Sequence, residues 1–208
     1  MTTLLYIEAS PLKDTSHSID ASRAFLEAYA SLHPSHEIDV LDLWQAELPP
    51  FDAATIEAKF AVLRRRQFTP EQHAKWEAVR SVSQRFNRAD KYVFSVPMWN
   101  FSIPYPLKHY IDVVTLAGEN WTWSREEGYR GLLSGKKALL VYSSAGDYPV
   151  LPAAASDFQK PYMRRWLKFL GIDDVSEIGI APTLSDPQPL ALLKEQARRS
   201  AAELAASF

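Results

Sequence analysis

The chain contains the stretch Tyr92-Val93-Phe94-Ser95-Val96-Pro97-Met98-Trp99-Asn100-Phe101, in which an apolar run passes directly into an aromatic loop. Residues 92–96 are short and rich in Val and aromatic side chains, which is typical of a buried strand in a parallel sheet. In an open α/β sheet, ligands bind just beyond the carboxyl ends of the strands. We therefore expect residues 97–101 to follow a strand and to face a ligand.

Four other apolar runs resemble residues 92–96. They cover residues 4–9, 38–43, 138–143 and 175–181. Because helical patterns separate the runs, the sequence predicts a doubly wound α/β fold, with a parallel sheet and helices on both faces. Five strands favour the flavodoxin-like order 2-1-3-4-5, which places a nucleotide site near the switch point between the first and third strands.

The segments between the runs have apolar residues at helical spacing. Helices are expected from Ser18, over residues 70–87, from Pro104 or Pro106 to Gly118, over residues 158–170 and after Pro189. Two segments exceed a minimal five-stranded unit. Residues 47–67 are expected to be partly helical over 56–66, and in residues 119–134 the triplet Trp121-Thr122-Trp123 alternates like a hairpin strand.

Length, charge and cysteine content limit the class of protein. The 208 residues favour one domain over residues 1–208, and a net charge of −2 gives no indication of nucleic-acid binding. The absence of cysteine excludes disulfides, thiol nucleophiles and thiolate metal sites. No signal peptide precedes the run at Leu4 and no run has membrane-spanning length, so we expect a cytoplasmic protein with no membrane contact.

The loop after the first run carries Ser10, Ser16 and Ser18, with His17 between the last two. The N-terminus of a helix has unpaired N–H groups and partial positive charge, so it binds phosphate readily. The loop lacks both the glycine-rich dinucleotide fingerprint and the P-loop sequence, and its hydroxyls suit the phosphate monoester of a mononucleotide. The alternative, which this loop alone favours, is that Ser16 or Ser18 only caps the helix.

The loop after the third run contains Met98, Trp99, Asn100 and Phe101. Thioether, aromatic and carboxamide groups make a wall for a flat ring with polar edges. Its N–H groups are expected to reach the edge of a flavin ring, with Met98 or Trp99 packed on the ring. The alternative is an apolar plug between two helices, which a buried Asn100 carboxamide would disfavour because it needs hydrogen-bond partners.

The loop after the fourth run consists of Ser143, Ser144, Ala145 and Gly146. Glycine permits close backbone approach or a positive φ, although an ordinary turn is the simpler interpretation of this loop alone. Because the first, third and fourth strands end at one edge of the sheet, the three loops should converge. Together they predict a site for a flavin nucleotide.

Other constellations predict no chemistry. No His, Asp and Glu spacing resembles a metal site, and no Gly-x-Ser-x-Gly elbow is present. His33 and His36 lie in polar contexts and are expected to be exposed. No catalytic acid or base is assigned, since a flavin itself supplies the redox chemistry.

These residues resemble the FMN-dependent NADH-azoreductase family, also described as NADH:quinone oxidoreductases. The resemblance runs through the whole chain and is carried by Ser10, residues 16–18, residues 97–101, Leu107-Lys108, Tyr110-Ile111-Asp112, Gly135-Lys136-Lys137-Ala138 and residues 143–146. It implies a flavodoxin-like fold, tightly bound FMN and a homodimer with two active sites at the interface. It also implies that Ser10 and residues 16–18 hold the FMN phosphate, that residues 98–101 line the isoalloxazine and that residues 143–146 contact the ring from another side.

The chain departs from the family pattern at two places. Relatives often have Ser-Arg-Gly-Gly where this chain has Ser143-Ser144-Ala145-Gly146, which alters the contacts expected at the pyrimidine edge of the ring. Trp121 and Trp123 lie in a segment that caps the site in relatives, and they are larger than the residues that some relatives use. They are expected to narrow the pocket.

The activity implied by the resemblance is an FMN-dependent NAD(P)H oxidoreductase that reduces quinones or azo compounds by ping-pong two-electron transfer, with NADH or NADPH as the donor. The main alternative is a flavodoxin-type electron carrier without a nicotinamide site, which the near-neutral, mixed charge disfavours because carriers need an acidic docking face. A non-flavin binding protein on the same fold and a phosphoester hydrolase are further alternatives, the latter without visible metal ligands or an activated nucleophile.

Overall fold

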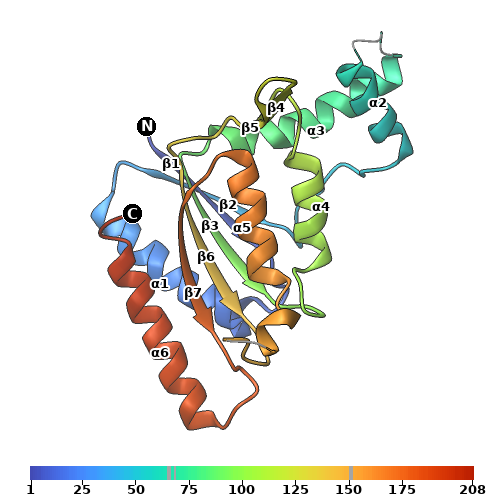
Figure 1. Cartoon of the computed structure of the whole chain (residues 1–208). Helices are drawn as coiled ribbons and strands as arrows, with labels where there is room; N and C mark the ends of the chain where they lie inside the picture. Colours follow the sequence, from blue (N-terminus) through green and yellow to red (C-terminus); the bar gives the residue numbers. More distant parts are fainter. Residues whose placement is uncertain (65–66, 68, 150–151) are drawn as a thin grey trace.

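A parallel five-stranded sheet forms the centre of the chain (Figure 1). The computed structural model describes residues 1–64, 67, 69–149 and 152–208. The order across the sheet is β2 (Glu37–Asp42), β1 (Thr3–Glu8), β3 (Lys91–Pro97), β6 (Lys137–Ser143) and β7 (Asp174–Ile180). Neighbouring strands all pair in parallel, so the predicted order 2-1-3-4-5 is confirmed.

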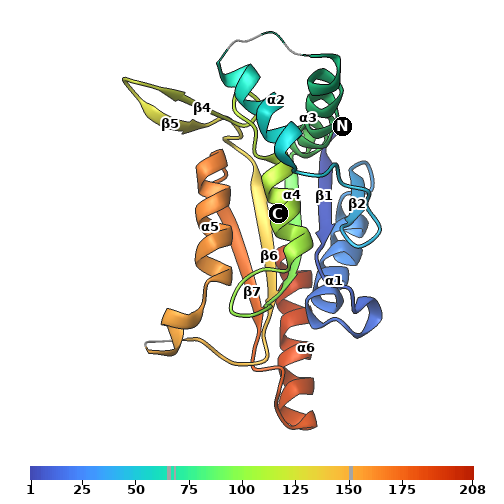
Figure 2. The same ribbon diagram turned by 90° about the vertical axis from the view of Figure 1, so that its right-hand side faces the viewer.

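Two helical layers cover the sheet, because alternate residues of each strand point to opposite faces (Figure 2). Leu4, Tyr6 and Val93 pack with helices α1 (His17–Leu32) and α6 (Pro187–Leu204). Leu5 and Phe94 pack instead with the helices of the other layer, which are α3 (Pro70–Arg88), α4 (Tyr105–Val114) and α5 (Gln159–Leu170). The continuous apolar character of the runs follows from burial on both faces.

The helix boundaries follow capping chemistry. Thr69 and Gln72 form a capping box at the start of α3, with Pro70 in the first turn. The last helix begins at Pro187 rather than after Pro189, because both prolines fall in the first turn, where a helix needs no N–H donor. Helix α4 ends at Val114, earlier than the end expected at Gly118. Gly118 lies in the turn that follows, with a φ of 81°.

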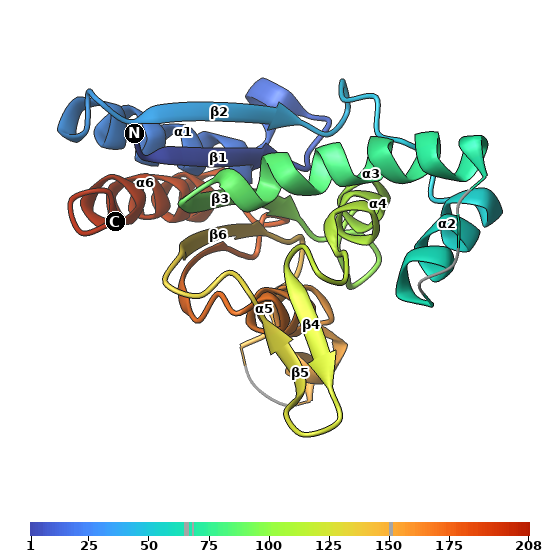
Figure 3. The same cartoon turned by 90° about the horizontal axis from the view of Figure 1, so that it is seen from above.

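The two additional segments are both structured. Helix α2 covers Ala53–Leu63, with Asp52 as its N-cap, and residues 65 and 66 of the expected 56–66 helix lie outside the described residues. The predicted hairpin is confirmed as strands β4 (Trp121–Ser124) and β5 (Gly128–Gly131). Seen from above, it projects beyond α5 (Figure 3).

The hairpin joins the end of α4 to the start of β6, which places it at the amino edge of the sheet (Figure 1). There it packs closely on the end of α5, since a Cβ on Gly131 would lie 2.2 Å from the backbone N of Gly171. The described residues also include two short 3-10 helices, Lys13–Thr15 and Ala153–Ser156. None of the helices in the described part of the chain is long and apolar enough to cross a membrane.

Candidate cofactor site

The three predicted loops meet at the carboxyl edge of the sheet. We call residues 9–18 the serine loop, residues 97–102 the ring loop and residues 143–146 the β6 loop. The backbone N of Ala9 donates to the carbonyl of Ser95 at 3.1 Å, and the N of Met98 donates to the carbonyl of Ser143 at 2.7 Å. Hydrogen bonds between adjacent strand ends therefore fix the loops side by side, as expected from the topology.

The serine loop buries its hydroxyls at the start of α1. Ser10, Ser16 and Ser18 are each at most 4% exposed. Ser16 Oγ accepts from the N–H of Ile19 at 3.4 Å and lies 3.3 Å from Ser18 Oγ, so the capping role is realised by Ser16. The cap and a ligand are compatible, because the N–H groups of the first helical turn have no partner within the helix.

His17 is the first residue of α1. Its Nδ1 is buried and has no hydrogen-bond partner among the described residues. Desolvation lowers the pKa of His17, and Lys194 lowers it further, against the opposing effect of Asp20. The ring is therefore neutral at pH 7, and a phosphate here would be bound by backbone N–H groups rather than by an imidazolium.

The ring loop is a tight turn with unusual backbone geometry. Trp99 and Ser102 exchange two backbone hydrogen bonds of 2.9 Å, and the central residues, Asn100 and Phe101, have φ of 46° and 69°. Asn100 is exposed, as is Phe101 at 52%, because the turn projects both from the sheet edge. A buried Asn100 carboxamide, which would have disfavoured the apolar plug, is therefore not found. The tip of the loop is thus exposed, whereas Met98 and Trp99 before it are partly buried.

The β6 loop is linked to the strand end next to it. Ser144 N donates to the carbonyl of Ile180 at 3.2 Å, and Ser144 Oγ donates to the carbonyl of Gly146 at 2.8 Å. Ala145 is exposed, and Gly146 lies against Tyr148, whose hydroxyl would be 3.2 Å from an added Cβ. An added Cβ at Gly146 would therefore require a small shift of the Tyr148 side chain, and the backbone of Gly146 does not have a positive φ.

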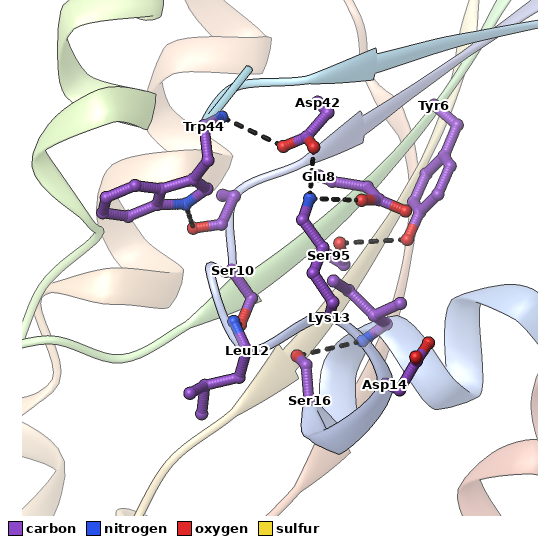
Figure 4. Close-up of polar contacts among 12 residues, drawn as sticks. Tyr6, Glu8, Ser10, Leu12, Lys13, Asp14, Ser16, Asp42, Trp44 and Ser95 are labelled. Atoms are coloured by element: carbon purple, nitrogen blue, oxygen red, sulfur yellow. Dashed lines mark hydrogen bonds and ion pairs between the residues drawn. The ribbon is translucent and has the colours of Figure 1, made fainter.

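The sequence interpretation missed a polar group beside the serine loop (Figure 4). Lys13 Nζ lies 2.8 Å from Glu8 Oε2 and 2.5 Å from Asp42 Oδ2. Trp44 donates through Nε1 to the carbonyl of Ala9 at 3.1 Å. The available signal was the position of Asp42 and Trp44 at the end of a parallel strand.

The hydroxyls of Tyr6 and Ser95 lie 3.2 Å apart across β1 and β3 (Figure 4), and both residues are buried. Burial raises the pKa of Tyr6, so its phenol stays protonated at neutral pH. Tyr6 therefore adds no charge beneath the serine loop.

The residues fit FMN. Buried serine hydroxyls and the N-terminus of α1 suit a phosphate, and the exposed ring loop next to them suits a flat ring. Among the residues that the structure describes, no three His, Cys, Asp or Glu side chains are grouped to hold a metal ion. The roles predicted for the individual loop residues toward FMN stay predictions.

The segment expected to cap the site lies elsewhere in the same chain. Trp121 and Trp123 belong to the hairpin at the amino edge, opposite the three loops (Figure 1). Trp121 lines a cavity of about 400 Å³, together with Tyr129 of the hairpin and aromatic side chains of α5. The expectation that Trp121 and Trp123 narrow the pocket is therefore wrong within one chain, because the hairpin lies away from the ring loop.

Known proteins resemble this chain over its whole length. Residues 2–204 match the family described as having the flavodoxin-like fold. The FMN-dependent NADH:quinone oxidoreductase 9 of Burkholderia lata is 44% identical over 188 residues, 88% of this chain and 89% of that protein. An FMN-dependent NADH:quinone oxidoreductase of Nitratidesulfovibrio vulgaris is 39% identical over 209 residues, 98% of this chain and 100% of that protein.

Solved structures of azoreductases also resemble this chain. The azoreductase from Bacillus anthracis str. Sterne superposes with a TM-score of 0.92 at 28% identity, covering 100% of both chains. An FMN-dependent NADH-azoreductase from Bacillus anthracis str. Ames Ancestor, solved in complex with FMN, gives a TM-score of 0.87 at 28% identity, over 99% of this chain and 100% of that one. With the loops in the arrangement described above, the chain belongs to the flavodoxin-like fold family and, within it, to the FMN-dependent NADH:quinone oxidoreductases.

Proposed function

We propose that residues 1–208 form one FMN-binding domain, and that the protein is an FMN-dependent NADH:quinone oxidoreductase that also accepts azo compounds. The observation that carries the proposal is the pairing of the buried serine loop with an exposed ring loop at one edge of the sheet. Relatives of this family are named for FMN, NADH and quinones, and solved neighbours for azo reduction.

The proposed roles follow from the position of each loop. Backbone N–H groups of residues 16–18 and the hydroxyls of Ser10, Ser16 and Ser18 bind the phosphate. Residues 98–101 lie along the ring, and residues 143–146 contact it from the neighbouring strand end. In place of the arginine found in many relatives, Ser144 offers a hydroxyl that already donates to Gly146, so the pyrimidine edge receives neutral contacts only.

The protein's contribution to the reaction is orientation rather than acid–base chemistry. When bound, FMN supplies ping-pong two-electron chemistry, taking hydride from NADH and passing two electrons to the acceptor. The ring loop holds one face of the site with a rigid turn, and the open side leaves room for donor and acceptor to bind in turn. Water at this open edge supplies the proton that the acceptor needs.

The proposal includes a homodimer. The hairpin cannot cover the loops of its own chain, yet it presents Trp123, 58% exposed, and Tyr129, 68% exposed. Beside it lies the 400 Å³ cavity, lined by apolar and aromatic side chains of α4, α5 and the hairpin and by Phe51, with Lys59 of α2 and Asp112 of α4 as its charged members. A second copy seated there buries these rings and brings a hairpin toward the partner's ring loop. Sedimentation equilibrium of the full chain tests this: a monomer at micromolar concentration contradicts it.

An anaerobic visible spectrum of the FMN-loaded protein, before and after NADH is added, tests the function. Bleaching of the flavin band, followed by recovery with a quinone, is the expected result. Bound flavin that NADH and NADPH both leave unbleached would favour the electron-carrier alternative instead. The cytoplasmic location expected from the sequence stays a prediction, to be checked by cell fractionation.

A further inference from the structure

Lys13 is the only lysine or arginine of the serine loop, and its side chain is directed away from the hydroxyls. Its ammonium lies between the carboxylates of Glu8 and Asp42, at 2.8 and 2.5 Å (Figure 4). The three side chains are partly buried, with 34%, 13% and 23% of Lys13, Glu8 and Asp42 exposed. Two of the three N–H donors of the ammonium therefore face carboxylates, and the group of one cation and two carboxylates does not attract a phosphate.

The backbone of Lys13 supports the same interpretation. Its φ of 45° lies in the left-handed region, which a non-glycine residue adopts only when its surroundings hold it there. The bonds from Lys13 to β1 and β2 provide that restraint. They fix the turn that leads directly into Ser16 and the start of α1.

The segment after β2, residues 42–44, makes a second contact with the serine loop. Trp44 N donates to Asp42 Oδ1 at 3.0 Å, which orients the carboxylate, and Trp44 Nε1 donates to the carbonyl of Ala9 at 3.1 Å. The indole also packs against the rings of Trp99 and Tyr105, each with centroids 5.6 Å away. This segment thus touches both the serine loop and the ring loop, and we call it the brace.

We propose that the brace positions the serine loop for the phosphate of FMN, with Asp42 and Trp44 as positioning residues and Lys13 as a strut rather than a phosphate ligand. The inference rests on the proposed function and adds residues outside the three loops. It makes an unusual prediction for Asp42, because removing a negative charge beside a phosphate site should strengthen anion binding by simple electrostatics. If the brace holds the loop in shape, the same change weakens binding.

The test compares FMN with riboflavin, which has the same ring but no phosphate. The full-length chain, freed of flavin, is titrated with each ligand by the quenching of flavin fluorescence. Asp42→Asn, Lys13→Met and Trp44→Phe are each expected to raise the Kd for FMN by at least about fivefold, since each removes a restraint on the loop. The Kd for riboflavin should change by less than about twofold in Asp42→Asn and Lys13→Met, because the ring loop is untouched.

Matched controls come from the other edge of the sheet, where Lys137 pairs with Asp174 at 3.6 Å. Asp174→Asn and Lys137→Met should leave the ratio of the two Kd values unchanged. Tighter or unchanged FMN binding in Asp42→Asn, together with weaker binding in Lys13→Met, overturns the proposal and makes Lys13 a phosphate ligand. A loss of affinity for both flavins in equal proportion also overturns it, as a general loss of structure.

The two proposals fail in distinguishable ways. If the wild-type chain does not bind FMN, or binds riboflavin equally well, the proposed cofactor site is wrong. If the wild type prefers FMN and every brace variant keeps that preference, only the brace is wrong. Should Asp42→Asn fail to fold, as judged by circular dichroism, Glu8→Gln decides the question, because it removes the other carboxylate that holds Lys13, at 2.8 Å, and leaves the aromatic rings in place. Weaker FMN binding with unchanged riboflavin binding in Glu8→Gln supports the brace, and tighter or unchanged FMN binding overturns it.

Discussion

At the residue scale, the most informative position is Asn100. Its φ of 46°, next to 69° at Phe101, marks a turn with two consecutive left-handed residues, neither of which is glycine. Asn is among the few residues that tolerate this region, whereas Phe is not. Backbone strain of this kind concentrates at binding sites, where the fold holds a loop in the shape that a ligand needs.

Replacing Asn100 separates the backbone role from the side-chain role. Asn100→Ala should lower the free energy of unfolding by about 1 kcal/mol, because alanine disfavours positive φ, and Asn100→Gly should recover most of that loss. If the carboxamide contacts FMN, however, both variants bind FMN more weakly. Urea denaturation and FMN titration measure the two effects. If Asn100→Gly binds FMN with wild-type affinity, the Asn100 carboxamide does not contact FMN.

His36 gives a prediction for pH. Its ring stacks on His33 with centroids 4.7 Å apart, and its Nδ1 lies 2.8 Å from the hydroxyl of Tyr29, so neither histidine is as exposed as its sequence context suggested. Desolvation lowers the pKa of His36 from 6.5, and the charges of His33 and Lys91 lower it further, against Asp90.

The direction in which stability changes with pH follows from the number of protons that the folded and unfolded chains bind. Between the lowered pKa and 6.5 the unfolded chain binds more protons than the folded chain, so stability is present above pH 6.5 and is lost as the pH falls below it. Urea denaturation at several pH values should show this loss in the wild type and a flatter profile in His36→Asn. Equal slopes in the two proteins would contradict the assignment to His36.

At the scale of elements, the hairpin depends on one glycine. An added Cβ at Gly131 would lie 2.2 Å from backbone atoms of both Leu170 and Gly171, and the backbone cannot move aside as a side chain can. Gly131→Ala should therefore lower the free energy of unfolding by about 3 kcal/mol, or detach the hairpin from α5. Gly179→Ala, where nothing lies within 4 Å of the new atom, is the matched control. Thermal melts that coincide for the two variants would refute this close packing.

The elements themselves were largely predictable, and the contacts between them were not. Five apolar runs predicted the sheet and its order, because a strand buried on both faces has a continuous apolar sequence. The Trp121-Thr122-Trp123 alternation predicted the hairpin, because a strand buried on one face alternates. The brace has no comparable sequence pattern. Trp44 and Ala9 meet only because β1 and β2 pair in one register, and no local pattern encodes that meeting.

The ring loop also has a feature that its sequence does not predict. Its residue types predict a binding surface, but they do not show whether the Asn100 carboxamide is buried or exposed. The turn that exposes Asn100 depends on paired bonds between Trp99 and Ser102, which form only once the loop leaves the sheet. Residue types indicated what the loop offers, and backbone geometry decided where each group is presented.

At the scale of the whole molecule, cofactor binding should stabilise the fold. FMN at about 100 times its Kd adds about 2.7 kcal/mol to the free energy of unfolding, provided that the unfolded chain does not bind it. Riboflavin at the same concentration should add less, since it lacks the phosphate that the serine loop binds. Denaturation with and without each flavin measures both. Equal stabilisation by the two flavins would place the phosphate outside the serine loop.

The serine loop and the hairpin lie at opposite edges of one chain, and this has a genetic consequence. In the proposed dimer each site takes its loops from one polypeptide and its hairpin from the other. An allele disabled at Asn100 and an allele disabled at Trp123 would each be null alone. Co-expressed, they would form mixed pairs in which one site receives both defects and the other receives neither. Two null alleles would thus complement each other in one cell, as alleles of a strictly monomeric enzyme do not.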